Sequence, residues 1–158
     1  MDGSERLTIA ASPHTVYAVV SDVTRHPEWS QECRRARWLG GGAPGGAGPW
    51  LRGWNASGIL RWSRRCRVEV AEPGREFTFL TRGRPDSTRW SYRIYPGPEG
   101  TVLEEAWQVV VPLPAWARRL NTLLDPRRLP TDQHMRASLA KIARLCEREQ
   151  AHRDGQLH

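Results

Sequence analysis

A single carboxylate stands among apolar residues in the last alternating stretch of the sequence. In the set that begins at Thr101 and ends at Val111, every second residue is uncharged except Glu105. Because side chains alternate between the two faces of a strand, Glu105 is predicted on the buried face, where lost solvation raises the pKa of a carboxyl group. Arg64 is the matching exception in the alternating stretch 60–70, so the two side chains could form a pair inside the fold.

Three roles for Glu105 are open at this point. As a general base it could remove a proton next to a carbonyl, with Arg64 stabilising the enolate and Tyr92 serving as an acid or hydrogen-bond donor. It could instead orient a bound ligand. The third role is structural, a buried Arg64–Glu105 ion pair that holds a bent sheet together.

Asn55 and Tyr92 are further polar residues predicted on the same face. Asn55 shares its parity with Leu51 and Gly53, and its amide can both donate to and accept from a ligand oxygen. Tyr92 alternates with two apolar neighbours and would present its phenol to the interior. Alternatively, Asn55 is a buried amide satisfied by the backbone, and Tyr92 is a core residue with its hydroxyl at the rim.

Aromatic side chains dominate this predicted face. Flat ring walls suit a planar or polycyclic ligand, although eight tryptophans could equally fill the space and leave no cavity. A helical apolar stripe near the C-terminus would close the other side. The predicted binding wall comprises Asn55, Trp62, Phe77, Phe79, Trp90, Trp107, Met135, Leu139 and Ile142.

Other chemistry finds little support in the sequence. Cys33, Cys66 and Cys146 are odd in number and widely spaced, which indicates buried thiols and not a disulfide framework or a zinc site. His134, at the start of the long predicted helix, lies near the expected cavity mouth, and His26 is taken as a surface loop residue. The glycines of 40–48 lack the Lys-Ser/Thr ending of a phosphate loop, so we expect neither a metal nor a cofactor.

The elements that must position these residues follow from periodicity. Residues 7–10 form a short predicted strand, and Ser12-Pro13 is a strong helix start. A second short helical piece spans 22–29, and a strand-like stretch begins at Cys33. From residue 50 to 111 a period of two, interrupted by turns, predicts an antiparallel meander with one solvated face. Helices are predicted at 115–124 and from Thr131, capped by Thr131-Asp132, to about 151, with a frayed tail from about 152.

The length of 158 residues fits one domain, and no apolar run is long enough to span a bilayer. Residues 1–6 do not resemble a signal peptide, so we expect a cytoplasmic protein. The net charge of +7 arises almost wholly from arginine, since Lys141 is the one lysine. Such an excess permits binding to anionic partners, but the outer face of 61–69 carries no aromatic residue, so nucleic-acid binding is predicted to be absent.

The order of elements and a set of spaced residues resemble the helix-grip fold of the START-like (SRPBCC) superfamily, which includes polyketide cyclase/dehydrase-type proteins. The resemblance implies an α+β fold over about residues 7–150, in which a bent antiparallel sheet wraps around a long C-terminal helix and two short helices follow the first strand. The residues that carry the resemblance are Ala11-Ser12-Pro13, Val16-Tyr17, Trp29-Ser30, Gly53, Asn55, Trp62-Ser63, Glu72-Pro73-Gly74-Arg75, Arg89-Trp90, Gly100-Thr101, Glu105 and Trp107.

What the resemblance implies about function is a deep, largely apolar cavity between sheet and helix. Members of the superfamily bind lipids, sterols, hormones or aromatic polyketides, and some are cyclases or dehydratases. We therefore expect a carrier or sensor of a small hydrophobic, aromatic or polycyclic molecule. The alternative is a polyketide cyclase or dehydratase that uses Glu105, Arg64, Tyr92 and Asn55. The sequence leaves the ligand open, as well as the choice between monomer and homodimer.

Overall fold

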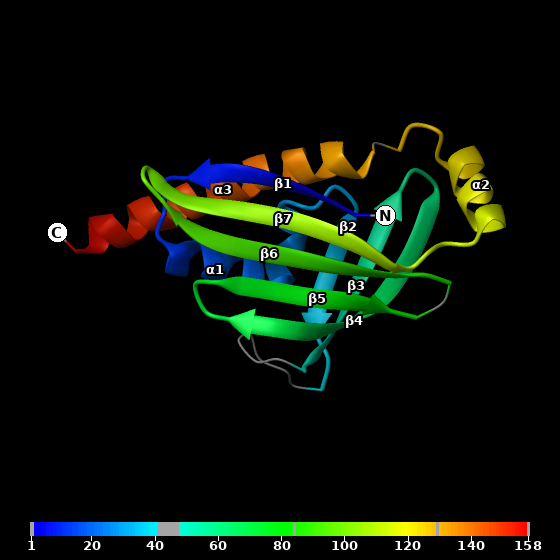
Figure 1. The fold of residues 1–158 in the computed structure, drawn as a ribbon, viewed down its shortest axis with the longest axis horizontal. Helices are drawn as coiled ribbons and strands as arrows, with labels where there is room; N and C mark the ends of the chain where they lie inside the picture. The colour runs from blue at the N-terminus through cyan, green and yellow to red at the C-terminus, as the bar shows by residue number, and fades with distance from the viewer. Residues whose placement is uncertain (1, 41–47, 84, 129, 158) are drawn as a thin grey trace.

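The architecture is a seven-stranded antiparallel sheet with one long helix. The structure is a computed structural model that describes residues 2–40, 48–83, 85–128 and 130–157. The strand order is β1-β7-β6-β5-β4-β3-β2 (Figure 1). The predicted α+β helix-grip class is therefore confirmed. The elements are β1 (Asp2–Ile9), α1 (Pro13–Ser21), the 3-10 helix η1 (Val23–Glu28), β2 (Cys33–Trp38), β3 (Trp50–Ser57), β4 (Leu60–Glu72), β5 (Glu76–Arg82), β6 (Ser87–Gly97), β7 (Gly100–Val111), α2 (Ala115–Leu124) and α3 (Thr131–Gln156).

The start of α1 is fixed by the predicted signal. The Ser12 hydroxyl accepts a hydrogen bond from the backbone N–H of Thr15 at 3.2 Å, and Pro13 occupies the first helical position. Val16, Val19 and Val20 are then buried on one side of the helix. The short helix η1 follows directly, so both short helices predicted after the first strand are present.

Register in the two long hairpins places the predicted polar residues on one face. In β6–β7, Tyr92 lies opposite Glu105, and in β3–β4, Asn55 lies opposite Trp62. The first strand is longer than predicted, because β1 pairs with β7 over its full length from Asp2 to Ile9. Most of the predicted loop 40–49, namely residues 41–47, falls outside the described residues.

Helix α3 provides the apolar face that the sheet surrounds. Met135, Leu139 and Ile142 are buried, as the stripe predicted. Its ends differ from expectation: Pro130 occupies the cap position without a side-chain hydrogen bond, and the helix continues to Gln156. A side-chain bond from Gln150 to Asp154 at 3.0 Å links successive turns, which explains the extra helical residues beyond 151.

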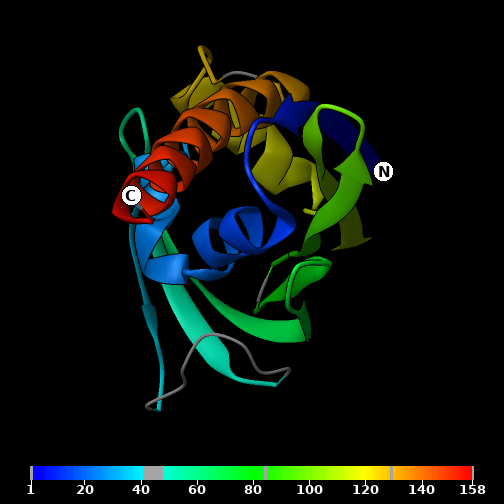
Figure 2. The same cartoon turned by 90° about the vertical axis from the view of Figure 1, so that its left-hand side faces the viewer.

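The sheet curls so that α1 and α3 lie on its concave side (Figure 2). The hydrophobic core fills the space between them, with Ile9, Phe77, Leu103 and Ile142 fully buried. In the part of the chain that the structure describes, no helix is long and apolar enough to cross a membrane.

Candidate functional site

A cavity of about 570 Å³ opens between the sheet, α2 and the start of α3. Its deep end is lined by buried side chains, among them Trp29, Tyr92, Glu105 and Met135. The other end is lined by exposed or partly exposed residues, namely Arg61, Trp62, Asp86, Trp116, Leu120 and Arg128, and these mark the mouth.

Eight of the predicted site residues line this cavity. They come from β3, β4, β5, β6, β7 and α3, so segments distant in sequence share one enclosed space. These eight are Asn55, Trp62, Arg64, Phe79, Trp90, Tyr92, Glu105 and Met135.

Four residues predicted for the binding wall do not line the cavity. Phe77, Leu139 and Ile142 face the interior but belong to the packed core, where little or none of their surface is exposed. Trp107 lies over Gly3 of β1, because a Cβ on Gly3 would meet the Trp107 Nε1 at 2.7 Å. Parity correctly assigned the face of these strands, but it does not say where along the face the open space begins.

Glu105 and Tyr92 form a buried polar pair at the deep end. The Tyr92 hydroxyl donates to the Oε1 atom of Glu105 at 3.3 Å, and the Oε2 atom is buried with no hydrogen-bond partner in the structure. Burial raises the pKa of Glu105 to about 8, although the bond from Tyr92 acts in the opposite direction. Burial and the neighbouring Glu105 also raise the pKa of Tyr92. At neutral pH the Glu105 carboxyl is therefore mostly protonated and can donate a hydrogen bond.

The adjacent Glu104 shows what pairing does to the same side chain. It points to the outer face, where Arg6 donates to it at 2.7 Å and Arg93 at 3.2 Å. Burial alone would raise the pKa of Glu104, but these two hydrogen bonds outweigh burial and lower it. Consecutive glutamates thus differ in charge state because one has cationic partners and the other faces the cavity.

The predicted Arg64–Glu105 pair is not among the ion pairs of the described residues. Arg64 pairs with Asp86, at the opposite end of the cavity from Glu105. Three strand steps separate β4 from β7, a path of about 14 Å along the sheet at the usual strand spacing. Shared parity brought both side chains to one face, but it did not bring them into contact.

His26 is a buried residue that the sequence analysis placed on the surface. Its ring lies 5.0 Å from that of Trp29, 5.7 Å from Phe79 and 6.4 Å from Tyr92, measured between centroids. Burial lowers the pKa of His26 to about 4, so the ring is neutral at physiological pH. Burial of His26 could have been predicted from Trp29, an aromatic residue three positions later and therefore about one helical turn away. His134, for which a surface position was the favoured interpretation, lines the cavity.

Helix α2 covers the mouth of the cavity, a role that the sequence analysis did not assign. Trp116, Ala117, Leu120 and Asn121 of this helix line the cavity. The sequence feature that could have indicated this role is the length of the segment 113–130. This segment is longer than a simple connection between the last strand and α3 requires.

Asp125 and Arg128 hold the α2 region against the rest of the mouth. Asp125, directly after α2, accepts a hydrogen bond from Ser57 in the β3–β4 hairpin, where Gly58 adopts a positive φ of 57°. Arg128 donates twice to Glu32, at 2.6 and 2.8 Å, and lies 5.3 Å from the ring centroid of Trp62. These contacts cross from the α2–α3 connection to β3, β4 and the segment before β2.

The cysteines are all free and buried. Burial raises the pKa of Cys66 and of Cys146 to about 12, so neither thiol is poised as a nucleophile. Among the described residues, no group of three or more His, Cys, Asp or Glu side chains is arranged to hold a metal ion.

Several solved structures share this fold at low sequence identity. A protein from Deinococcus radiodurans matches with a TM-score of 0.67 and 15% identity, over 93% of this chain and 97% of its own. The di-domain ARO/CYC StfQ from the steffimycin biosynthetic pathway matches with a TM-score of 0.67 and 14% identity, over 98% of this chain and 52% of its own. A START superfamily protein from Mycobacterium smegmatis matches with a TM-score of 0.61 and 19% identity, over 96% and 97%. These likenesses support the fold alone.

A search of curated proteins gave no match. A family model, by contrast, matches residues 3–147, which is nearly all of the sheet and most of α3. The START-like resemblance inferred from the spaced residues is thereby confirmed. The chain belongs to the family described as polyketide cyclase / dehydrase and lipid transport.

Proposed function

We propose that this protein binds a small hydrophobic, ring-containing molecule in its cavity and holds one oxygen atom of that molecule with the Glu105 carboxyl. Family membership and the START-like neighbours support a ligand-binding or cyclase role in general. The observation that carries the finer proposal is the buried Oε2 atom of Glu105, which lines the cavity and has no hydrogen-bond partner among the described residues. A buried polar atom without a partner costs free energy, and a ligand oxygen would satisfy it.

The size and walls of the cavity suit such a ligand. A volume of about 570 Å³ falls within the range of small-molecule sites, roughly 300–1,000 Å³. Trp29, Phe79 and Trp90 supply aromatic surface around the deep end, and Met135 provides an adaptable apolar contact from α3. A planar molecule that accepts one hydrogen bond at its buried end fits this distribution.

Binding takes precedence over catalysis because most polar groups in the cavity already have partners. Arg64 pairs with Asp86 and Tyr92 donates to Glu105, so among the described lining residues the Oε2 atom of Glu105 and the Nε2 atom of Gln31 are the buried polar atoms without a partner. The Gln31 amide can help to anchor a ligand but is neither an acid nor a base, whereas acid–base chemistry on a carbonyl substrate usually needs at least two converging acid or base groups.

A matched pair of probes tests this proposal. We expect 2-acetylnaphthalene, which has a carbonyl oxygen, to quench tryptophan fluorescence with higher affinity than 2-ethylnaphthalene, which lacks it. Glu105→Leu should abolish this preference, at a loss of about 1–3 kcal/mol for the acetyl probe. Trp90→Leu should weaken both probes, while Trp107→Leu, which removes an indole outside the cavity, should weaken neither. Equal affinity of the two probes for the wild-type protein would contradict the anchoring role.

The second candidate is a cyclase or dehydratase in which Glu105 is a general acid. The mostly protonated carboxyl beside the Tyr92 phenol favours this over a general base, because a base must be ionised at working pH. In the dehydration of a β-hydroxy carbonyl compound, Glu105 would protonate the departing hydroxyl, which leaves as water, and the resulting carboxylate would accept the proton from the α-carbon. Glu105→Gln keeps a hydrogen-bond donor but has no acidic proton, so turnover should disappear while probe affinity remains. Absence of turnover with such substrates by the wild-type protein would leave binding as the function.

A further inference from the structure

The outer face of β2–β5 carries an uninterrupted row of arginines. Register pairs Arg37 of β2 with Arg52 of β3, Arg52 with Arg65 of β4, and Arg65 with Arg82 of β5. Four guanidinium side chains therefore follow one another directly across four neighbouring strands, over about 14 Å at the usual strand spacing. The row lies on the side of the sheet opposite to Leu51, Gly53 and Cys66, which face the interior.

Two tryptophans border the row on the same strand face. Trp54 lies on one side, with the guanidinium carbons of Arg35, Arg37 and Arg52 at 5.1, 5.4 and 5.2 Å from its ring centroid. Trp50 lies on the other side, with Arg65 at 5.3 Å, and is paired in register with Arg67. We call these eight residues the arginine face: Arg35, Arg37, Trp50, Arg52, Trp54, Arg65, Arg67 and Arg82.

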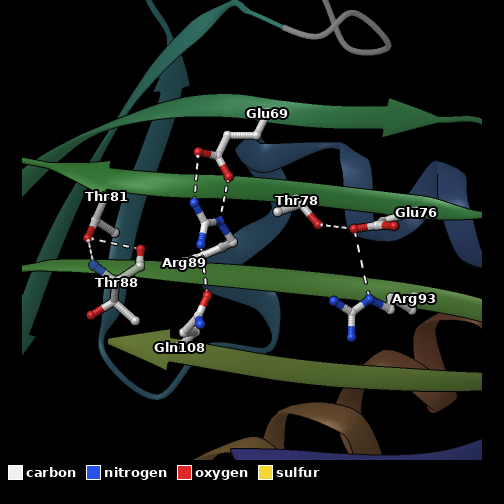
Figure 3. A network of polar contacts seen from close by, with 8 residues as sticks. All are labelled: Glu69, Glu76, Thr78, Thr81, Thr88, Arg89, Arg93 and Gln108. Atoms are coloured by element: carbon white, nitrogen blue, oxygen red, sulfur yellow. Dashed lines mark hydrogen bonds and ion pairs between the residues drawn. The ribbon is translucent and has the colours of Figure 1, made fainter. Parts of the chain in front are cut away.

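The arginines of the arginine face form no ion pair among the described residues, although Glu69 lies near enough to Arg67 and Arg82 for their charges to help lower its pKa after its bond from Arg89. On β4–β7, Glu69 pairs with Arg89 at 2.6 Å and Glu76 approaches Arg93 at 3.9 Å, as Figure 3 shows. Of the ion pairs among described residues, in contrast, none includes an arginine of the arginine face. In the part of the chain that the structure describes, the Nε atom of Arg52 is in addition buried without a hydrogen-bond partner.

Such an arrangement is unfavourable for the isolated protein. Like charges placed directly opposite on neighbouring strands repel each other, and here three successive cross-strand pairs are alike. A polyanion would relieve this repulsion, and the tryptophans beside the row offer flat surfaces on which bases stack. We propose that the arginine face binds single-stranded nucleic acid, with phosphates along the row and bases against Trp50 and Trp54.

The shape of the sheet favours a single strand over other anionic partners. The arginine face lies on the convex side, because the sheet curls around α1 and α3 on its other side (Figure 2). A flexible strand can follow a convex surface, whereas a flat membrane or a straight duplex touches it over a narrow strip. The expectation of no nucleic-acid binding rested on the outer face of 61–69, which carries no aromatic residue, whereas both tryptophans lie on β3.

Fluorescence anisotropy of labelled oligouridylate and oligothymidylate tests this proposal on the full chain. We expect binding that weakens as the salt concentration rises. The triple variant Arg37→Gln, Arg65→Gln, Arg82→Gln should reduce the slope of log affinity against log salt concentration by about two, at roughly 0.7 per phosphate contact. Trp54→Leu should weaken binding by about tenfold through lost stacking. The matched control Arg144→Gln, Arg148→Gln, Arg153→Gln removes the same charge from exposed positions of α3, and it should bind within about twofold of the wild type at physiological salt.

Several results would overturn the proposal. Equal weakening by the control triple variant would show that the total charge and not the row is responsible. Unchanged affinity of Trp54→Leu would exclude stacking, and tighter binding to duplex or to phosphatidylserine vesicles would assign the face to another partner. Circular dichroism and binding of 2-acetylnaphthalene show whether each variant is folded, because the arginine face and the cavity lie on opposite sides of the sheet.

Discussion

Replacing Glu105 by glutamine should make the stability of the protein depend less on pH. The carboxyl has a pKa of about 8 in the folded protein against 4.5 for an exposed glutamate. Between these values the folded state keeps a proton that the unfolded chain has released, so wild-type stability falls as the pH rises. Each pH unit contributes about 1.4 kcal/mol, which amounts to about 5 kcal/mol over the whole window.

Glutamine keeps the oxygen that accepts from Tyr92 and places a neutral amide where the free Oε2 lies. We therefore expect the free energy of unfolding of Glu105→Gln, relative to wild type, to increase by about 2–3 kcal/mol between about pH 6 and about pH 8. Guanidinium denaturation of both proteins at several pH values measures this difference. Other titrating groups, including His26, are common to both proteins and cancel. A difference that stays constant with pH would mean that Glu105 is already ionised in the fold, and the reasoning from burial would be wrong.

Three further perturbations test other parts of the structure. The pKa of His26 is about 4 in the fold against 6.5 when exposed, so the folded protein resists protonation that the unfolded chain accepts. The free energy of unfolding of the wild type should therefore fall by about 3 kcal/mol relative to His26→Phe as the pH drops through that window, which denaturation at acidic pH measures. Arg128→Ala should change the free energy of unfolding by less than about 1 kcal/mol, because the pair of Arg128 with Glu32 is partly exposed. The same variant should release 2-acetylnaphthalene faster in stopped-flow experiments, and an unchanged dissociation rate would argue against a role of this contact in closing the cavity. Ile142→Asp should unfold the protein by placing an unpaired charge in the core, whereas Ile142→Val should cost about 1 kcal/mol, and a folded aspartate variant in thermal melts would contradict the packing of α3 against the sheet.

Side-chain parity accounts for most of what the sequence could predict about the site. It assigned Glu105, Tyr92 and Asn55 to the inner face, since strand alternation is a local property that needs no knowledge of the fold. Distance across the sheet is not local, and for that reason Arg64 was matched with Glu105 although three strand steps separate their strands. Parity also cannot separate core from cavity, as Phe77 on one side of that boundary and Phe79 on the other demonstrate.

Two features of the structure could not be predicted from sequence periodicity. The covering role of α2 depends on contacts such as Ser57–Asp125, between residues 68 positions apart in the chain. The arginine face depends on register between strands, since Arg37 and Arg82 belong to a single row only when β2, β3, β4 and β5 are aligned. Each arginine by itself looked like an ordinary solvated residue.

The two consecutive glutamates of β7 have a consequence for the fidelity of folding. A slip of one residue in β7 moves every side chain to the opposite face. In one direction Glu104 would enter the fully buried position of Leu103, far from its arginines. In the other direction Leu103 would meet Arg6 and Arg93, which would then lack their carboxylate. Either misaligned sheet loses an ion pair or buries a charge, so this short segment opposes misregistration of the longest hairpin in both directions.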